Sequence, residues 1–290
     1  MTGTVAVVTP AYDAARWIGA CARSVLTQSH GDWEHWIVAD DGRDYQRLLA
    51  DAGLADPRQR FLSSGAIGGG ASRARNVALD AITAPCVAIL DVDDRFKPDK
   101  LRQAVKALET FPIVSSALEE FDETGRTLRF VGQGPDRVLS PAEHKWVSLS
   151  MDSMILWDRH KTDARYDLEL TNMTDLELLL QLYRTVDRSY HLGSPLHDYL
   201  KLSVSMSNGP GVTEKMIRAK REILRRLEAG HYAMADASGP EGMAQFLRIS
   251  LEAEETYPAA LADNPGLLFE DHIEPRLRAM STSSTSGIDG

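Results

Sequence analysis

The chain has few cysteines, no long apolar run and fewer basic than acidic residues, and each shortage excludes a class of protein. Cys21 and Cys86 cannot make a disulfide framework and have no metal-ligand spacing around them, which fits a reducing cytosol. The longest apolar runs fall far short of the ~20 residues that span a bilayer. With 32 basic and 42 acidic residues the net charge is −10, which excludes general nucleic-acid binding.

The sequence also lacks a leader segment and the loop motifs of several enzyme classes. The N-terminus has no basic, apolar leader, so we expect no signal peptide and a cytoplasmic protein; contact with the inner face of the membrane stays open. The chain contains neither G-x-x-x-x-G-K-[ST] nor G-x-S-x-G. Nicotinamide dehydrogenases and nucleotidylyltransferases need a glycine-rich loop directly after the first strand, and Thr9–Tyr12 stands there instead. These enzyme classes are therefore disfavoured.

What is present is an ordinary globular composition with a regular order of elements. The 290 residues correspond to about two units at ~150 residues per domain. Short apolar runs predict buried strands, and apolar residues at helical spacing lie between them. This alternation predicts an α/β domain with parallel strands. The expected strands cover residues 5–8, 36–39, 60–62 and 86–90, with helices after Asp13, over 72–82 and from Pro98.

Beyond residue 110 the pattern is mixed. Strands are expected over 127–131 and 153–157, and helices over 174–183, 214–229 and 241–255. Residues 207–211 break the chain with serine, asparagine, glycine and proline. We therefore predict a first domain over 1–207, a helical extension over 208–278 and a disordered low-complexity tail over 279–290.

Polar residues follow three of the predicted strands, at Thr9–Tyr12, at Asp40–Gly42 and at Asp91–Asp94. Adjacent parallel strands bring such ends together, at the edge where open α/β sheets bind ligands. Three carboxylates within Asp91-Val92-Asp93-Asp94 repel one another, and Mg²⁺ or Mn²⁺ bridging to substrate phosphates would relieve that repulsion. The alternative is a solvated acidic turn before the next helix.

The other motifs have simple structural explanations as well. Asp41-Gly42 forms a common turn dipeptide, and Asp13 is expected to cap a helix. The glycine-rich segment 68–70 leads into a helix start whose Arg73 or Arg75 could meet an anion. Thr174 and Glu177 fit a capping box around Asp175.

Taken together, these motifs closely resemble family 2 glycosyltransferases of the GT-A fold, strongly over residues 4–110 and weakly to about 207. The resemblance implies a Rossmann-like nucleotide-diphospho-sugar transferase domain, here with a C-terminal helical extension. The motifs are V-x-V-V-T-P-x-Y, S-V-L-x-Q at 24–28, D-W-E at 32–34, I-V-x-D-D-G, A-R-N at 74–76 and I-L-D-x-D-D.

The resemblance further implies metal-dependent, inverting transfer of one sugar from a nucleotide-sugar donor, usually UDP-linked, to a glycan, lipid-linked or small-molecule acceptor. Asp175 would be the general base. Mn²⁺ or Mg²⁺ would be held by Asp93 with Asp91 and Asp94. The nucleotide would be bound by Thr9, Pro10, Ala11, Tyr12, Asp41, Arg73, Arg75, Asp91 and Val92.

The chain also departs from the family pattern. The family's usual Glu-Asp pair is Thr174-Asp175 here, and leucines at 200 and 202 stand where many members carry arginine and histidine before Ser205 and Ser207. The Q-x-x-R-W pattern of processive synthases is absent, which predicts transfer of a single sugar. A GT-A-like nucleotide-binding protein without transferase activity stays an alternative, and so does a homodimer.

Overall fold

The computed structural model describes residues 3–147, 154–202 and 211–285, with side chains to residue 279. Within these residues one sheet runs in the order β3-β2-β1-β4-β9-β6-β10-β5, with β7 added to β6 and β8 to β10. The strands are β1 (Val5–Ala11), β2 (Trp33–Ala39), β3 (Gln59–Ser63), β4 (Cys86–Ile89), β5 (Arg95–Phe96), β6 (Ile113–Phe121), β7 (Thr127–Val131), β8 (Arg137–Leu139), β9 (Leu156–Asp158) and β10 (Ser189–Leu200).

The N-terminal half of the sheet is parallel, as predicted. Strand β1 pairs in parallel with β2 and β4, and β2 pairs in parallel with β3. Strand β1 does not stop at Pro10 but continues to Ala11 beside β2, whereas its pairing with β4 ends at Val8. Proline is tolerated there because no neighbour on the β4 side needs its missing N–H.

The sequence did not predict β6 and β10, which pair with each other in parallel. Strand β9 joins the two halves, because it is antiparallel to both β4 and β6. Strand β10 contains register shifts between Leu192 and His197, where a glycine and a proline interrupt the apolar pattern. A strand that is broken in this way has no clear period-2 signal.

Helices cover both faces of the sheet. Val5 and Val7 of β1 pack with residues of α1 and α4, whereas Ala6 and Val8 pack in a second cluster with residues of α3 and α6. This alternation is the strand period of two. The helices are α1 (Ile18–Leu26), α2 (Tyr45–Asp51), α3 (Ala71–Ala81), α4 (Lys100–Leu108), α5 (His144–Val147), α6 (Thr174–Leu182), α7 (Val212–Glu228), α8 (Gly239–Asp263) and α9 (Phe269–Thr285).

Two predicted helix caps are wrong. Asp13 has a left-handed backbone (φ 45°) and lies ahead of the turn that leads into α1, whose N-cap position is Trp17. Helix α6 follows Met173, which is also left-handed (φ 58°), and Thr174 is already inside the helix. Glu177 is not part of a capping box, because its carboxylate accepts hydrogen bonds from Gln181 and Tyr232.

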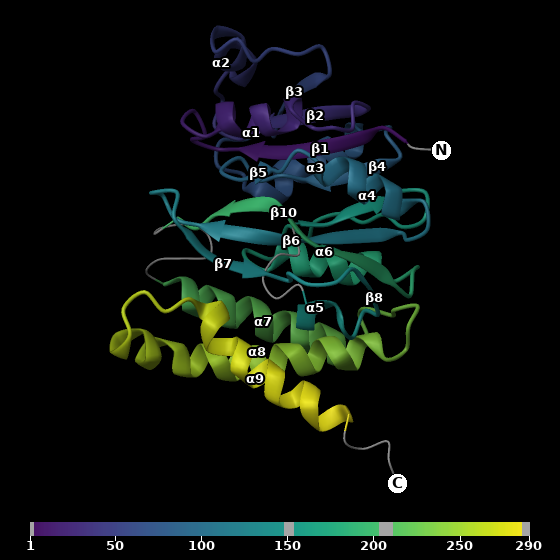
Figure 1. Ribbon diagram of the computed structural model, residues 1–290, viewed down its shortest axis with the longest axis vertical. Coiled ribbons are helices and arrows are strands. Elements are labelled where there is room, and N and C mark those ends of the chain that lie inside the picture. Colours follow the sequence, from purple (N-terminus) through teal and green to yellow (C-terminus); the bar gives the residue numbers. More distant parts are fainter. Residues whose placement is uncertain (1–2, 148–153, 203–210, 286–290) are drawn as a thin grey trace.

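The C-terminal helices α7, α8 and α9 lie at the end of the molecule opposite α2 (Figure 1). They share a hydrophobic core with the sheet domain, since Ile223, Leu227 and Leu247 belong to the same buried cluster as Leu176 and Leu179 of α6. The predicted boundary at 207/208 falls outside the described residues, and so do positions 286–290 of the expected tail; α9 itself continues to Thr285. None of the helices in the described part of the chain is both long and apolar enough to cross a bilayer.

A buried carboxylate marks the contact between the sheet and α9. Glu120 of β6 has no exposed surface, and neither of its carboxylate oxygens has a hydrogen-bond donor among the described residues. Burial and the nearby charge of Glu270 raise the pKa of Glu120 to about 7, against the opposing effect of Lys201 and Arg129. The folded protein therefore favours the protonated form of this side chain.

We expect Glu120→Gln to stabilise the protein at pH 8 by about 1–3 kcal/mol, with little effect near pH 4.5. The folded pKa lies above the unfolded one, so the wild type loses stability as the pH rises from about 4.5 to about 7, and the amide removes that loss. Urea unfolding at several pH values measures this difference. In the control Glu119→Gln the replaced carboxylate pairs with Lys97, so no gain at pH 8 is expected there; equal stability of Glu120→Gln and wild type at pH 8 would contradict the prediction.

Candidate active site

The polar ends of β1, β2 and β4 meet at one edge of the sheet, as the parallel pairing requires. The backbone N–H of Asp13, after β1, donates to Oδ2 of Asp41, after β2, at 2.8 Å. Asp91, after β4, lies 2.5 Å from the guanidinium of Arg75 on α3. Arg75 in turn reaches Asp175 on α6 at 3.0 Å. Segments from across the chain therefore build one site.

Asp41 organises the turn after β2. Its carboxylate accepts hydrogen bonds from the backbone N–H groups of Asp13 and Arg43 and from the hydroxyl of Tyr45. Partial burial works against the charged form, but these donors and the charge of Arg43 lower the pKa of Asp41. The side chain is therefore ionised at neutral pH and holds the turn beside the end of β1.

The segment after β1 presents mainly backbone and one aromatic ring. Thr9 is fully buried, with its hydroxyl 3.0 Å from Nε2 of His35, and Ala11 is also buried. Tyr12 is 59% exposed, and its ring lies near Gly68 of the loop before α3. Pro10, between Thr9 and Ala11 in the strand, is half-buried. An exposed aromatic ring at this edge can stack on the flat face of a base.

Asp40 holds the glycine-rich loop that precedes α3, a role that the sequence analysis missed. Its carboxylate accepts hydrogen bonds from Ser64 Oγ (2.5 Å) and from the backbone N–H groups of Gly69 (3.1 Å) and Gly70 (2.8 Å). Arg73 is folded back, with Nε donating to the carbonyl of Ser64 at 3.1 Å. An acidic residue 29 positions before the glycine that it binds is a weak signal, because only the parallel pairing of strands brings the two together.

Arg75 is the centre of the site. Its side chain is only 4% exposed and lies between Asp91 and Asp175, which are 31% and 29% exposed. Its guanidinium carbon also lies 4.9 Å from the ring centroid of Tyr166. Burial opposes the charge of Arg75, but the two carboxylates outweigh it and raise its pKa well above the usual value. The arginine therefore keeps two carboxylates together that would otherwise repel each other.

The acidic residues after β4 point in different directions. Asp94 is buried, with Oδ2 3.0 Å from Nε2 of His197 and Oδ1 accepting from the backbone N–H of Leu200. Asp93 is half-buried, and burial and the charge of Asp91 raise its pKa to about 6. Val92 packs against the small hydrophobic cluster that includes Ala11. Asp91 and Asp93 therefore remain at the open edge, while Asp94 faces the interior.

The carboxylates at this edge fit a divalent cation that is shared with a substrate. Within the described ranges, no three His, Cys, Asp or Glu side chains are arranged to hold a metal by themselves. Burial and the negative charge of Asp91 raise the pKa of Asp93, and a dication beside this carboxylate would favour its charged form. Magnesium-type sites often use one or two carboxylates and complete their shell with phosphate oxygens and water. Asp93 suits that arrangement, with Asp91 beside it at the open edge, where one of its oxygens pairs with Arg75; Asp94 is buried against His197.

Behind the acidic residues lies a buried polar chain that the sequence analysis did not find. Nδ1 of His197 is 3.0 Å from Nζ of Lys100, which also lies 3.3 Å from Ser116 Oγ. Burial lowers the pKa of Lys100 to about 7, against the opposing charge of Asp94. This chain connects the turn after β4 to α4, β6 and β10. The leucines that the resemblance singled out lie nearby, Leu200 at the end of β10 and Leu202 beyond it, while Ser205 and Ser207 lie outside the described residues.

Comparisons with known proteins agree on one family. Residues 6–142 match the model of glycosyl transferase family 2. A Bacillus subtilis protein named as a teichuronic acid biosynthesis glycosyltransferase, TuaG, is 30% identical over 80% of this chain and 91% of its own length. The Escherichia coli glucosyltransferase WfgD, whose name gives UDP-Glc and GlcNAc-diphosphoundecaprenol, is 32% identical over 36% of this chain and 40% of its own length.

Solved structures share the fold at low sequence identity. S. aureus TarS (residues 1–349) in complex with UDP-GlcNAc has a TM-score of 0.66 at 15% identity, covering 94% of this chain and 79% of that one. A mannosyltransferase from Pyrobaculum calidifontis in complex with GDP-Man and Mn²⁺ has a TM-score of 0.57 at 16% identity, covering 98% and 80%. These likenesses support the GT-A fold.

Proposed function

Because this chain belongs to glycosyl transferase family 2 and is a glycosyltransferase of GT-A fold, we propose that it moves one sugar from a UDP-sugar to an acceptor hydroxyl, with inversion and with a divalent cation. The observation that carries the proposal is the position of Arg75. This buried arginine joins Asp91 of the donor side to Asp175 of the acceptor side within one site.

The donor nucleoside would bind between the ends of β1 and β2. Tyr12 offers an exposed ring for the base, and the turn held by Asp41 borders the same space through its hydrogen bond to Asp13. The glycine-rich loop held by Asp40 would close that side and bring the start of α3 towards the diphosphate. TarS, which has the same fold, was solved with UDP and with UDP-GlcNAc, and this supports a uridine donor.

The diphosphate would lie at the carboxyl end of β4. Asp93, with Asp91 beside it, would hold Mn²⁺ or Mg²⁺ there, and Asp94 would orient this turn from the interior through His197. When bound, such an ion neutralises the negative charge that develops on the leaving diphosphate. The mannosyltransferase of the same fold was solved with Mn²⁺, which supports this assignment.

Asp175 would act as the base. It would accept the proton of the acceptor hydroxyl while the hydroxyl oxygen bonds to the anomeric carbon, and the nucleoside diphosphate would leave with the electron pair of the broken bond. A single displacement of this kind inverts the anomeric centre. The acceptor would be a glycan, a lipid-linked sugar or a small molecule; the name of the relative WfgD gives a lipid-linked sugar, GlcNAc-diphosphoundecaprenol.

Binding of UDP tests the donor side. We expect Mn²⁺ to raise the affinity of the wild type for UDP by about tenfold or more, and Asp93→Ala to lose that gain, because the bridging ion loses its protein ligand. Calorimetric titration with and without Mn²⁺ measures both effects. Asp51→Ala, an exposed carboxylate on α2, serves as the control and should bind like the wild type.

Metal-independent UDP binding that Asp93→Ala leaves unchanged would sink the proposed metal site. If UDP binds but no donor is consumed with any acceptor, the chain would be a nucleotide-binding protein without transferase activity. One observation favours this second function. Asp175 already forms an ion pair with Arg75, and a paired carboxylate is a weaker base.

A further inference from the structure

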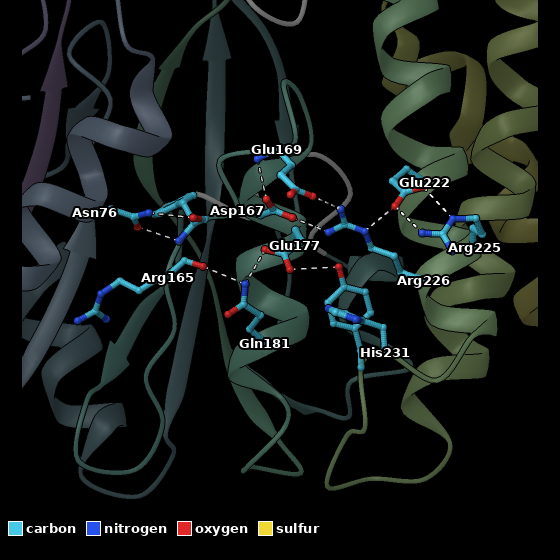
Figure 2. A network of polar contacts seen from close by, with 12 residues as sticks. Asn76, Arg165, Asp167, Glu169, Glu177, Gln181, Glu222, Arg225, Arg226 and His231 are labelled. Atoms are coloured by element: carbon cyan, nitrogen blue, oxygen red, sulfur yellow. Dashed lines mark hydrogen bonds and ion pairs between the residues drawn. The ribbon is translucent and has the colours of Figure 1, made fainter. Parts of the chain in front are cut away.

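We propose that the C-terminal helices position the catalytic carboxylate, and that Arg226 of α7 and Tyr232 after α7 are the residues that do so. The proposal rests on the proposed role of Asp175. It assigns a task to the part of the chain that follows the sheet domain. Figure 2 shows the contacts, which run from α7 across the segment before α6 to α3.

Arg226 grips the segment that precedes α6. Its guanidinium lies 2.5 Å from Asp167, 3.5 Å from Glu169 and 2.7 Å from Glu222, the last on its own helix. The side chains of Arg226 and Asp167 are only 12% and 17% exposed, so their ion pair is largely shielded from solvent. Burial alone would raise the pKa of Asp167, but the pairing with Arg226 outweighs burial and lowers it, so the contact stabilises the charged carboxylate.

The same segment is held from its other side by α3. Nδ2 of Asn76 donates to the carbonyl of Tyr166, and the backbone N–H of Tyr166 donates to Oδ1 of Asn76, both at 2.8 Å. The ring of Tyr166 lies against Arg75, the residue that binds Asp175. Arg226 therefore holds Asp167 immediately beside the residue that packs under the catalytic ion pair.

A second contact reaches α6 itself. The hydroxyl of Tyr232 donates to Oε1 of Glu177 at 3.1 Å, and Gln181 donates to Oε2 at 2.7 Å. Glu177 is 2% exposed and lies two positions after Asp175, in the first turn of the helix. The N-cap residue Met173 makes no side-chain hydrogen bond to the start of α6. The contact of Tyr232 with Glu177 therefore joins the segment after α7 to the first turn of α6, which carries Asp175.

Hydrogen exchange in Arg226→Met tests the positioning directly. We expect amide exchange over residues 163–178 to speed up about 5–30-fold, the factor that corresponds to a local loss of about 1–2 kcal/mol. The matched control is Arg225→Met. Arg225 is the residue before Arg226 on α7, and its exposed side chain pairs with Glu222 but not with Asp167. The control should exchange like the wild type.

Kinetics give the second readout. In Arg226→Met we expect kcat for sugar transfer to fall by a similar 5–30-fold, with the KM for the donor unchanged, since the donor side of the site is built from other segments. If Arg226→Met keeps the global fold and leaves exchange over 163–178 unchanged, the proposal is wrong. Should the variant unfold, Tyr232→Phe removes a single hydroxyl, and unchanged exchange over 174–182 in that protein also refutes the role of Tyr232.

The two proposals can fail separately. If the wild type transfers no sugar from any donor, the proposed function fails, while the exchange comparison of Arg226→Met with Arg225→Met still decides whether α7 holds this segment. If transfer occurs and kcat falls equally in both arginine variants, the positioning proposal fails and the function stands.

Discussion

Asp175→Asn should lower the rate constant for sugar transfer by about 10²–10⁴-fold, while the affinity for UDP changes little. The amide keeps the size of the carboxylate and can still contact Arg75, but it cannot take up the proton of the acceptor hydroxyl. Asp175 lies on α6, whereas the nucleotide is expected at the ends of β1, β2 and β4. The effect should therefore appear in kcat.

Single-turnover transfer and UDP titration on the same preparation separate chemistry from binding. Asp51→Asn is the control, because Asp51 is an exposed carboxylate on α2 outside the site, and its variant should keep the wild-type rate. A transfer rate in Asp175→Asn within tenfold of the wild type would mean that another group is the base.

Arg75→Met should destabilise the protein by about 3 kcal/mol, the largest stability effect that we expect for this site. Removing a buried cation leaves Asp91 and Asp175 facing each other without compensation. We take the lower end of the usual 3–5 kcal/mol, because both carboxylates are about one-third exposed and solvent screens part of their repulsion.

Urea unfolding at pH 7 measures the loss. Arg73→Met lies one half-turn earlier on the same helix, where the side chain is exposed and its Nε bonds only to the carbonyl of Ser64, so it should cost less than about 1 kcal/mol. Equal stabilities of the two variants would show that the bridge between Asp91 and Asp175 contributes little. Because raising the ionic strength screens repulsion between carboxylates, added salt should restore part of the lost stability in Arg75→Met.

Much of the fold could be predicted from local patterns. The apolar runs that form β1, β2, β3 and β4 are short, and segments with helical spacing of apolar residues separate them. This pattern predicted both that they are strands and that they pair in parallel. Among the predictions that failed, two concern single residues at helix starts. Asp13 and Thr174 are good capping residues by type, but the chain enters both helices through other conformations that depend on what packs behind them.

The acidic strand end shows the limit of sequence patterns most clearly. From the sequence Asp91-Val92-Asp93-Asp94 alone, each of the three carboxylates is an equally good candidate ligand for a metal. In the fold Asp94 meets His197, which lies 103 positions later, and this contact turns its carboxylate inward. His197 has no motif around it, so no pattern in the sequence could have indicated the pair.

The sequence by itself determined that this protein has a parallel α/β domain with polar residues at the ends of three strands, because backbone periodicity and turn chemistry are local properties. Only the tertiary structure decided which of those residues share a site. Arg75 and Asp175 are a hundred positions apart, and α7 reaches the segment before α6 from still further along the chain. Charge pairing and burial depend on such distant neighbours, and these become known only when the chain is folded.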